Sequence, residues 1–232
     1  MVSRGGIVII SHKYRFIFIK TRKTAGTSVE VYLSQICADS DIFTPITPPV
    51  ASHKPRNYKG IWNPVHEYRM TKGWKARRMI LEFFRRRRFY NHIPAAIVRS
   101  RMSEVTWQDY FKFCVERNPW DKTISHYAMR RHNSDGQLTV DEYFRQGYFC
   151  QNFPLYLDRN GGMLVDRVIK YETLNEELAE VFESLGIPYS GSLGIRAKST
   201  YRESQEIDID AFERHRHEIR RVYRKEIEMH GY

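Results

Sequence analysis

Two basic segments of the chain contain the residues best suited to chemistry on a phosphate group. The first follows the apolar run Phe16–Ile19 and contains Lys23, Gly26, Thr27 and Ser28, after which the residues take up a helical pattern. A strand, a short loop and a helix in this order can bind phosphate, because the backbone N–H groups of the loop and the helix N-terminus point toward the anion. Gly26, with no side chain, permits close approach of the backbone.

The order of residues in this loop differs from that of ATP-binding loops. The ATP pattern G-x-x-x-x-G-K-[ST] has its lysine after the second glycine, whereas Lys23 comes before Gly26, the one glycine of the loop. The segment therefore predicts phosphate binding without matching the ATP pattern, and an ordinary basic turn capped by threonine and serine is the alternative. The candidate ligands are Arg22, Lys23, Thr24, Ala25, Gly26, Thr27 and Ser28.

The second segment begins with the apolar run YFKFCV, residues 110–115, and continues with Arg117, Asn118 and Pro119. Asn118 can cap a helix whose first position suits Pro119. Arg117 offers a bidentate fork to a phosphate, and Ser125, farther along the expected helix, offers a hydroxyl donor. The alternative is an arginine paired with a carboxylate and a serine that faces water.

His92, in the segment NHIPAAIVR, is the candidate general base. An imidazole can accept a proton from a hydroxyl group near neutral pH. The alternative is a histidine that is hydrogen-bonded near a helix start ahead of Pro94. His66 with Glu67 is a rival, because both lie in an irregular segment where a second substrate can bind.

Elements that can position these residues are recognisable along the chain. Residues 7–10 and 16–19 predict two strands around a polar turn, and 164–171 predicts another strand. Helices are expected after the loop, over much of 78–102, after the capping boxes at Thr139 and Thr173, and over about 210–230. The alternation predicts a single α/β domain over 1–232 with a central, mainly parallel sheet flanked by helices. Ligands of such sheets bind at the carboxyl ends of strands, so the loops bearing Lys23 and Arg117 can face one ligand.

Composition narrows the class of protein. The 232 residues include 41% apolar residues and carry a net charge of +11, which predicts anionic partners such as nucleotides, acidic glycans, nucleic acid or a membrane surface. The three cysteines and the lack of CxxC argue against a disulfide framework or a structural zinc site. No apolar stretch reaches the length of a membrane span and no signal peptide is visible, so the expected location is the cytoplasm.

Two further segments attract attention. Residues 41–75 contain five prolines and predict a long irregular segment that serves as an acceptor site or a lid. The run Arg85–Arg88 can meet an anionic acceptor, although a charge run is usually a solvated helix face. Trp62, Trp74 and Trp107 can stack on sugar rings, with core packing as the default.

With these motifs identified, the chain resembles the sulfotransferases that use 3′-phosphoadenosine 5′-phosphosulfate (PAPS). It is most similar to the family of Golgi carbohydrate sulfotransferases and their soluble bacterial-type relatives. KTRKTAGTS resembles the family's 5′-phosphosulfate loop, P-K-T-[AG]-G-T-S, and YFKFCVERNPWDKTISHY resembles its 3′-phosphate motif. NHIPAAIVR, VIKYETL, LGIP and YRKEIEMHGY resemble its histidine segment and closing elements. Arg22 stands where the family usually has proline, and Glu116 where it often has an apolar residue.

The resemblance implies a P-loop-like fold and transfer of a sulfuryl group from PAPS to an acceptor hydroxyl, leaving 3′,5′-ADP, with no metal. It implies that Lys23 stabilises the leaving phosphate, that His92 is the base, and that Arg117 and Ser125 hold the 3′-phosphate. The late loop with Lys198, Ser199 and Arg202 is expected to cover the nucleotide, with a solvated basic loop as the alternative. The expected acceptor is a glycan or a small molecule, and the oligomeric state is open.

Two other functions fit part of the sequence. A small-molecule or nucleotide kinase shares the strand, loop and helix, but the chain lacks the G-K-[ST] pattern and a clear strand that ends in a magnesium-binding aspartate. A nucleic-acid-binding protein fits the charge, but no RNA-recognition, finger or KH signature occurs. Nucleic acid is therefore not the expected partner.

Overall fold

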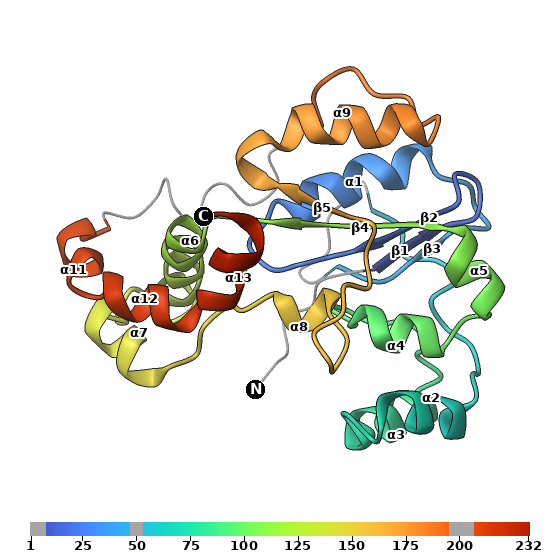
Figure 1. The fold of residues 1–232 in the computed structure, drawn as a ribbon, viewed down its shortest axis with the longest axis horizontal. Coiled ribbons are helices and arrows are strands. Elements are labelled where there is room, and N and C mark those ends of the chain that lie inside the picture. Colours follow the sequence, from blue (N-terminus) through green and yellow to red (C-terminus); the bar gives the residue numbers. More distant parts are fainter. Residues whose placement is uncertain (1–7, 47–52, 195–206) are drawn as a thin grey trace.

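A mixed β-sheet lies at the centre of the fold (Figure 1). The computed structural model describes residues 8–46, 53–194 and 207–232, and in these the sheet has five strands in the order β3-β1-β2-β4-β5. The strands are β1 (Val8–Ser11), β2 (Phe16–Ile19), β3 (Ile42–Phe43), β4 (Phe111–Glu116) and β5 (Arg167–Lys170). The α/β class and the strands expected near 7–10, 16–19 and 110–115 are confirmed, whereas β5 is shorter than the predicted 164–171.

Strand directions divide the sheet into two parts. β2, β4 and β5 are parallel neighbours, whereas β1 pairs antiparallel with both β2 and β3. β1 and β2 form a hairpin in which Val8 lies opposite Ile19, because the polar turn between them is too short for a crossover helix. The sheet is therefore mixed, and the prediction of a mainly parallel sheet holds only for its β2-β4-β5 half.

Alternate residues of the central strands feed two buried cores, one on each face of the sheet. Phe16 and Phe18 pack toward α1 (Gly26–Ile36) and α9 (Leu174–Ser184). Ile17 and Ile19 pack on the other face with α4 (Ala95–Ser100) and α8 (Phe153–Tyr156). Figure 1 shows the helices on both faces. A strand that is apolar at every position, as β2 is, suits a sheet that is covered on both sides.

A third buried cluster joins the helices beyond the ends of the parallel strands. Its side chains come from α6 (Pro119–His132), α7 (Val140–Gln146), α11 (Ile209–Arg214) and α12 (Arg216–Val222). The last helix is α13 (Arg224–His230), and α5 (Glu104–Asp109) leads into β4. The chain end over 210–230 thus forms three short helices instead of the single long helix predicted.

The predicted helix starts had mixed outcomes. Asn118 accepts a hydrogen bond from the Trp120 N–H at 2.9 Å, and Thr139 forms a complete capping box with Glu142, both as expected. Thr173 is the last residue of the 3₁₀ turn Tyr171–Thr173 and directly precedes α9, but its hydroxyl donates to Glu177 and makes no cap. The helical prediction for 78–102 was too long, because α3 (Ala76–Phe84) ends before the arginine run and α4 begins only after Pro94.

The segment expected to be irregular, 41–75, contains regular structure. Its described part begins with β3 and includes α2 (Pro64–Thr71), which Asn63 caps by accepting from two backbone N–H groups. Proline at the first helical position, read in the sequence as a breaker, here starts the helix. Trp62 and Trp107 are buried in the fold, which confirms packing as their default.

A buried ionic cluster connects the sheet to the helices at its edge. The Lys122 ammonium, on α6, lies 2.7 Å from Glu116 at the end of β4 and 3.0 Å from Glu226 on α13, and all three side chains are fully buried. Tyr156 donates to Glu116, and the backbone N–H of Asn152 donates to Glu226. Burial raises the pKa of Glu226, and the nearby Glu116 carboxylate raises it further, whereas the Lys122 ammonium opposes both effects.

Replacing Lys122 by methionine should destabilise the fold, because it leaves two carboxylates buried without their cation. Removing one partner of a buried ion pair costs about 3–5 kcal/mol, and we expect a loss of about that size in the free energy of unfolding, measured in urea. The exposed Lys225→Met is the matched control and should change stability by less than about 0.5 kcal/mol. A Lys122→Met protein as stable as the control would contradict the role of this cluster.

Candidate functional site

The two basic segments meet at one edge of the sheet. β2 and β4 are parallel neighbours with Ile19 opposite Cys114, so the loop 20–25 and the turn 117–118 leave the sheet from the same edge. The Thr21 hydroxyl donates to the backbone carbonyl of Val115 and ties the loop to β4. Lys23 and Arg117 thus both follow the carboxyl ends of adjacent strands, where parallel sheets bind ligands. Figure 1 shows β4 running from α5 to α6 at this edge.

Internal hydrogen bonds hold the shape of the loop. Asn152 pairs with the Arg22 backbone in both directions, accepting from its N–H at 2.9 Å and donating to its carbonyl at 3.1 Å. The hydroxyls of Thr21 and Thr24 lie 2.8 Å apart. Lys23 and Ala25 both have a left-handed backbone, with φ of 63° and 54°. Non-glycine residues take this conformation only where their surroundings enforce it, and such residues concentrate at functional sites.

Gly26 makes room for a lysine that the sequence did not single out. The Lys20 ammonium lies 3.1 Å from the Glu30 carboxylate and donates to the Thr27 hydroxyl at 3.0 Å. A Cβ atom at position 26 would lie 2.7 Å from Cγ of Lys20. The side chain of Lys20 therefore passes over Gly26, so the need for glycine here comes from the packing of the protein itself.

His92 lies beside the loop in a form that can accept a proton. Its Nδ1 is 3.1 Å from the Lys20 carbonyl, and because a carbonyl only accepts, Nδ1 carries the hydrogen and Nε2 the lone pair. Burial lowers the pKa of His92 to about 3, and the charges of Arg22 and Lys20 add to this effect. The ring is therefore neutral near pH 7. Its φ of 48° is one that asparagine also tolerates.

Several cations converge on this place from separate segments. Burial, together with the charges of Lys23, Arg130 and Arg22, lowers the pKa of His126 on α6 to about 3. Partial desolvation, with the charges of Arg78 and Arg22, lowers the pKa of Lys75 to about 8. These shifts mean that positive groups lie within electrostatic reach of one another. We call this set the cationic cluster: Arg22, Lys23, Lys75, Arg78 and Arg130.

The cluster suits an anionic ligand. Like charges held close together raise the free energy of the protein, and a bound polyanion offsets that cost. The sequence pointed to Arg22 and Lys23, but Lys75, Arg78, Arg130 and His126 are additions from the structure. His126 follows Ser125 directly, and its Nδ1 lies 2.9 Å from the Tyr143 hydroxyl. No sequence signal distinguished these residues from other surface cations.

Arg117 and Ser125 lie at the start and in the middle of the α6 region. The Arg117 guanidinium sits 4.2 Å above the ring of Tyr171, which follows β5, and the side chain is half-buried. Ser125 is half-buried on α6. Arg117 thus lies between the ends of β4 and β5, on the far side of β4 from the loop that follows β2.

The rival base has a structural task. The Glu67 carboxylate accepts two hydrogen bonds from Arg101, at 2.8 and 2.9 Å, and one from the Trp62 indole at 2.6 Å. Glu67 is buried, whereas His66 is exposed on α2. The paired carboxylate fixes α2 to the segment after α4, so Glu67 is engaged in holding the fold together. The predicted Lys198, Ser199 and Arg202 lie outside the described residues.

No group of three or more histidine, cysteine, aspartate or glutamate side chains among the described residues is arranged to hold a metal ion. No helix in residues 8–46, 53–194 and 207–232 combines the length and apolar character needed to cross a membrane.

Comparison with known proteins gives one relative to report. The chain is 36% identical over 101 residues to a protein of Archaeoglobus fulgidus that is described only as uncharacterized. The match spans 41% of this chain and 84% of the archaeal protein. No family model and no solved structure matches the chain.

Lowering the pH below about 6.5 should destabilise the protein through His92 and His126. Each pKa is lowered to about 3, so between these values the unfolded chain binds a proton at each ring and the native protein does not. The free energy of unfolding then falls by up to about 1.4 kcal/mol per pH unit for each histidine. His92→Asn and His126→Asn should each flatten this slope in urea titrations, and unchanged slopes would contradict the burial described.

Proposed function

We propose that this protein, which belongs to one family with the uncharacterized protein of Archaeoglobus fulgidus, is a sulfotransferase that uses PAPS. The observation that carries the proposal is the position of Lys23 and Arg117 after the carboxyl ends of adjacent parallel strands. PAPS has anionic groups at both ends of its ribose, and two basic loops at one sheet edge suit such a molecule. The motif resemblance of both loops supports the same donor.

The residues at this edge fit the donor in charge and in type. The loop from Arg22 to Ser28 and the N-terminus of α1 would hold the 5′-phosphosulfate, since backbone N–H groups and the helix dipole favour anions there. Arg117 and Ser125 would hold the 3′-phosphate. The cationic cluster supports this assignment, because a dianionic group beside Arg22 relieves the repulsion that adds to desolvation in lowering the pKa of Lys75. PAPS supplies the sulfuryl group that is transferred.

His92 and Lys23 divide the chemical work. In-line transfer needs a base on the acceptor side and positive charge on the leaving side. His92 is neutral with its lone pair on Nε2, and it takes the acceptor hydroxyl's proton. An anion bound beside Arg22 and Lys20 offsets the charges that contribute to the low pKa of His92, so the ring becomes more basic when the donor is present. Lys23 neutralises charge on the departing phosphate.

The acceptor is a hydroxyl compound, and we propose a glycan or a small molecule. The cations that border the cluster favour an acceptor with its own negative charge, such as an acidic sugar. Arg78 lies within electrostatic reach of His92, and Lys75, at the start of α3, lies within reach of Arg78, so we assign acceptor selection to these two residues.

Binding of 3′,5′-ADP is the direct test. Lys23→Ala and Arg117→Ala should each weaken binding at least about tenfold in calorimetry, because a hydrogen bond to a charged group contributes about 1.5–3 kcal/mol. Arg15→Ala is the matched control, since Arg15 precedes β2 at the opposite edge, where it pairs with Asp109. Arg117→Ala should also reduce the preference for 3′,5′-ADP over AMP. The absence of a thermal shift with millimolar 3′,5′-ADP, or tight binding of Mg-ATP instead, would refute the proposal.

Replacing His92 by asparagine should separate chemistry from binding. Asparagine accepts the left-handed backbone and can still donate to the Lys20 carbonyl, so 3′,5′-ADP affinity should stay within about twofold of the wild type. Sulfate transfer to a panel of glycan and small-molecule acceptors should fall about 10²–10⁴-fold, the usual contribution of a general base. Wild-type transfer rates in His92→Asn would show that another group is the base.

A further inference from the structure

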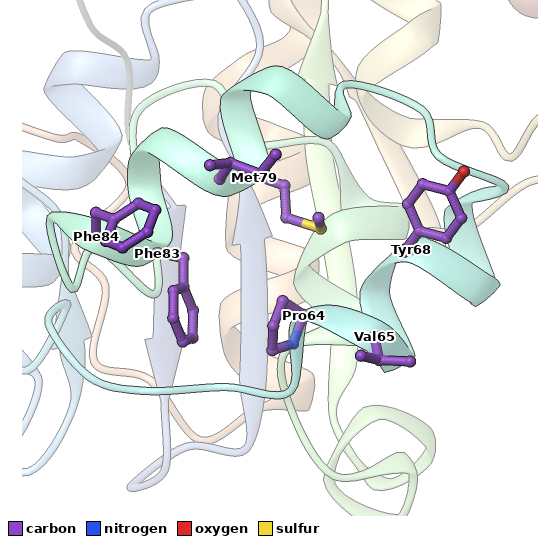
Figure 2. Close-up of a pocket in the computed structure, with 7 residues that line it drawn as sticks. Pro64, Val65, Tyr68, Met79, Phe83 and Phe84 are labelled. Atoms are coloured by element: carbon purple, nitrogen blue, oxygen red, sulfur yellow. The ribbon is translucent and has the colours of Figure 1, made fainter.

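The α2–α3 hairpin (residues 59–88) has an unusually apolar surface. Its large exposed apolar side chains are Ile61, Val65, Tyr68, Met70, Ile80, Leu81 and Phe84, with Phe84 81% and Ile61 70% exposed. Between α2 and α3 lies an open apolar groove of about 340 Å³, lined by Pro64, Val65, Tyr68, Met79, Ile80, Phe83 and Phe84. Figure 2 shows the side chains of both helices around this groove. Exposed apolar surface of this extent marks a binding surface.

The exposed charged side chains of the same hairpin all have one sign. Its two acidic residues are both buried: Glu67 is bonded to Arg101, and Glu82 lies 3.9 Å from Arg78 and from Arg87. Within this fully described stretch, every exposed charged side chain is therefore basic. These side chains are Lys59, Arg69, Lys72, Lys75, Arg77, Arg85, Arg86 and Arg87.

Helix geometry places basic side chains beside the apolar ones. On α2, Val65 and Arg69 are four residues apart, and on α3, Arg77 and Leu81 are four apart, so each arginine adjoins the apolar face. Arg85 and Arg86 follow Phe84 directly where α3 ends. An apolar face with a border of arginines is the arrangement by which helices lie in the interface of an anionic bilayer.

We propose that the α2–α3 hairpin docks this protein on the surface of anionic phospholipid membranes. Phe84, Ile80 and Leu81 enter the boundary between headgroups and acyl chains, and the arginines contact lipid phosphates. The inference does not depend on the proposed sulfotransferase activity, because the apolar residues and exposed arginines assigned to the membrane lie outside the cationic cluster.

Charge complementarity selects this occupant over others. A second copy of the chain would bring the same arginines face to face, and their repulsion disfavours such a dimer. A nucleic acid would use the arginines but leaves no reason for an exposed Phe84 or an apolar groove. A bilayer with acidic lipids uses both features at once.

Vesicle sedimentation with the full chain tests the proposal. We expect the protein to sediment with vesicles of equal parts phosphatidylcholine and phosphatidylglycerol, and to stay in solution with phosphatidylcholine alone. The double variants Ile80→Ser/Phe84→Ser and Arg85→Gln/Arg86→Gln should each weaken binding about tenfold or more. Matched controls are Val105→Ser, an exposed apolar residue on α5, and Arg224→Gln, an exposed arginine on α13. Both should bind as the wild type does.

Several results would overturn the proposal. Equal sedimentation with neutral and anionic vesicles removes the role of the arginines, and equal loss in Val105→Ser removes the role of the hairpin. A dimer that Ile80→Ser/Phe84→Ser dissociates, in a protein that does not bind vesicles, assigns the surface to self-association. RNA binding that only the arginine variant loses, without vesicle binding, assigns it to nucleic acid. Thermal melting checks that each variant is folded, with Phe84→Ser alone as the milder variant.

Discussion

The buried ammonium of Lys122 between Glu116 and Glu226 is the interaction on which the candidate site depends. It joins the end of β4 and the neighbouring α6 to α13, whose Glu226 follows Lys122 by 104 residues. Asn152 extends it, donating to Glu116 and pairing with the Arg22 backbone. A buried charge tolerates little displacement of its partners, because their hydrogen bonds offset a large desolvation cost. These hydrogen bonds thus fix the position of the loop that bears Lys23.

The surroundings of the loop that bears Lys23 differ from the Lys122 cluster, because they are rich in positive charge. At Lys122, two carboxylates share one ammonium, whereas around the loop itself burial and neighbouring cations together lower the pKa of Lys75, His92 and His126. Positive charges held near one another, together with left-handed backbone at Lys23, Ala25 and His92, store free energy in the ligand-free protein. An anion recovers part of that energy on binding. Charge arranged in advance in this way is what the proposed transfer reaction would need for its charge stabilisation.

The α2–α3 hairpin combines two different surfaces, one basic and one apolar. Lys75, at the N-terminal end of α3, lies within electrostatic reach of Arg22, whereas Phe84 at its other end is exposed to solvent. One short helix thus connects the cationic cluster to the apolar groove.

The sequence by itself determined the strands and helix starts whose formation depends only on neighbouring residues. The apolar run of β2, the cap at Asn118 and the capping box at Thr139 appear where neighbouring residues suffice to dictate them. The two basic motifs that contain Lys23 and Arg117 were also recognisable from the sequence. Only tertiary structure decided that β1 runs against β2, that Gly26 accommodates Lys20, that Glu67 is committed to Arg101, and that His126 and Lys75 approach Arg22. These outcomes depend on contacts between distant segments, whose distances no local periodicity encodes.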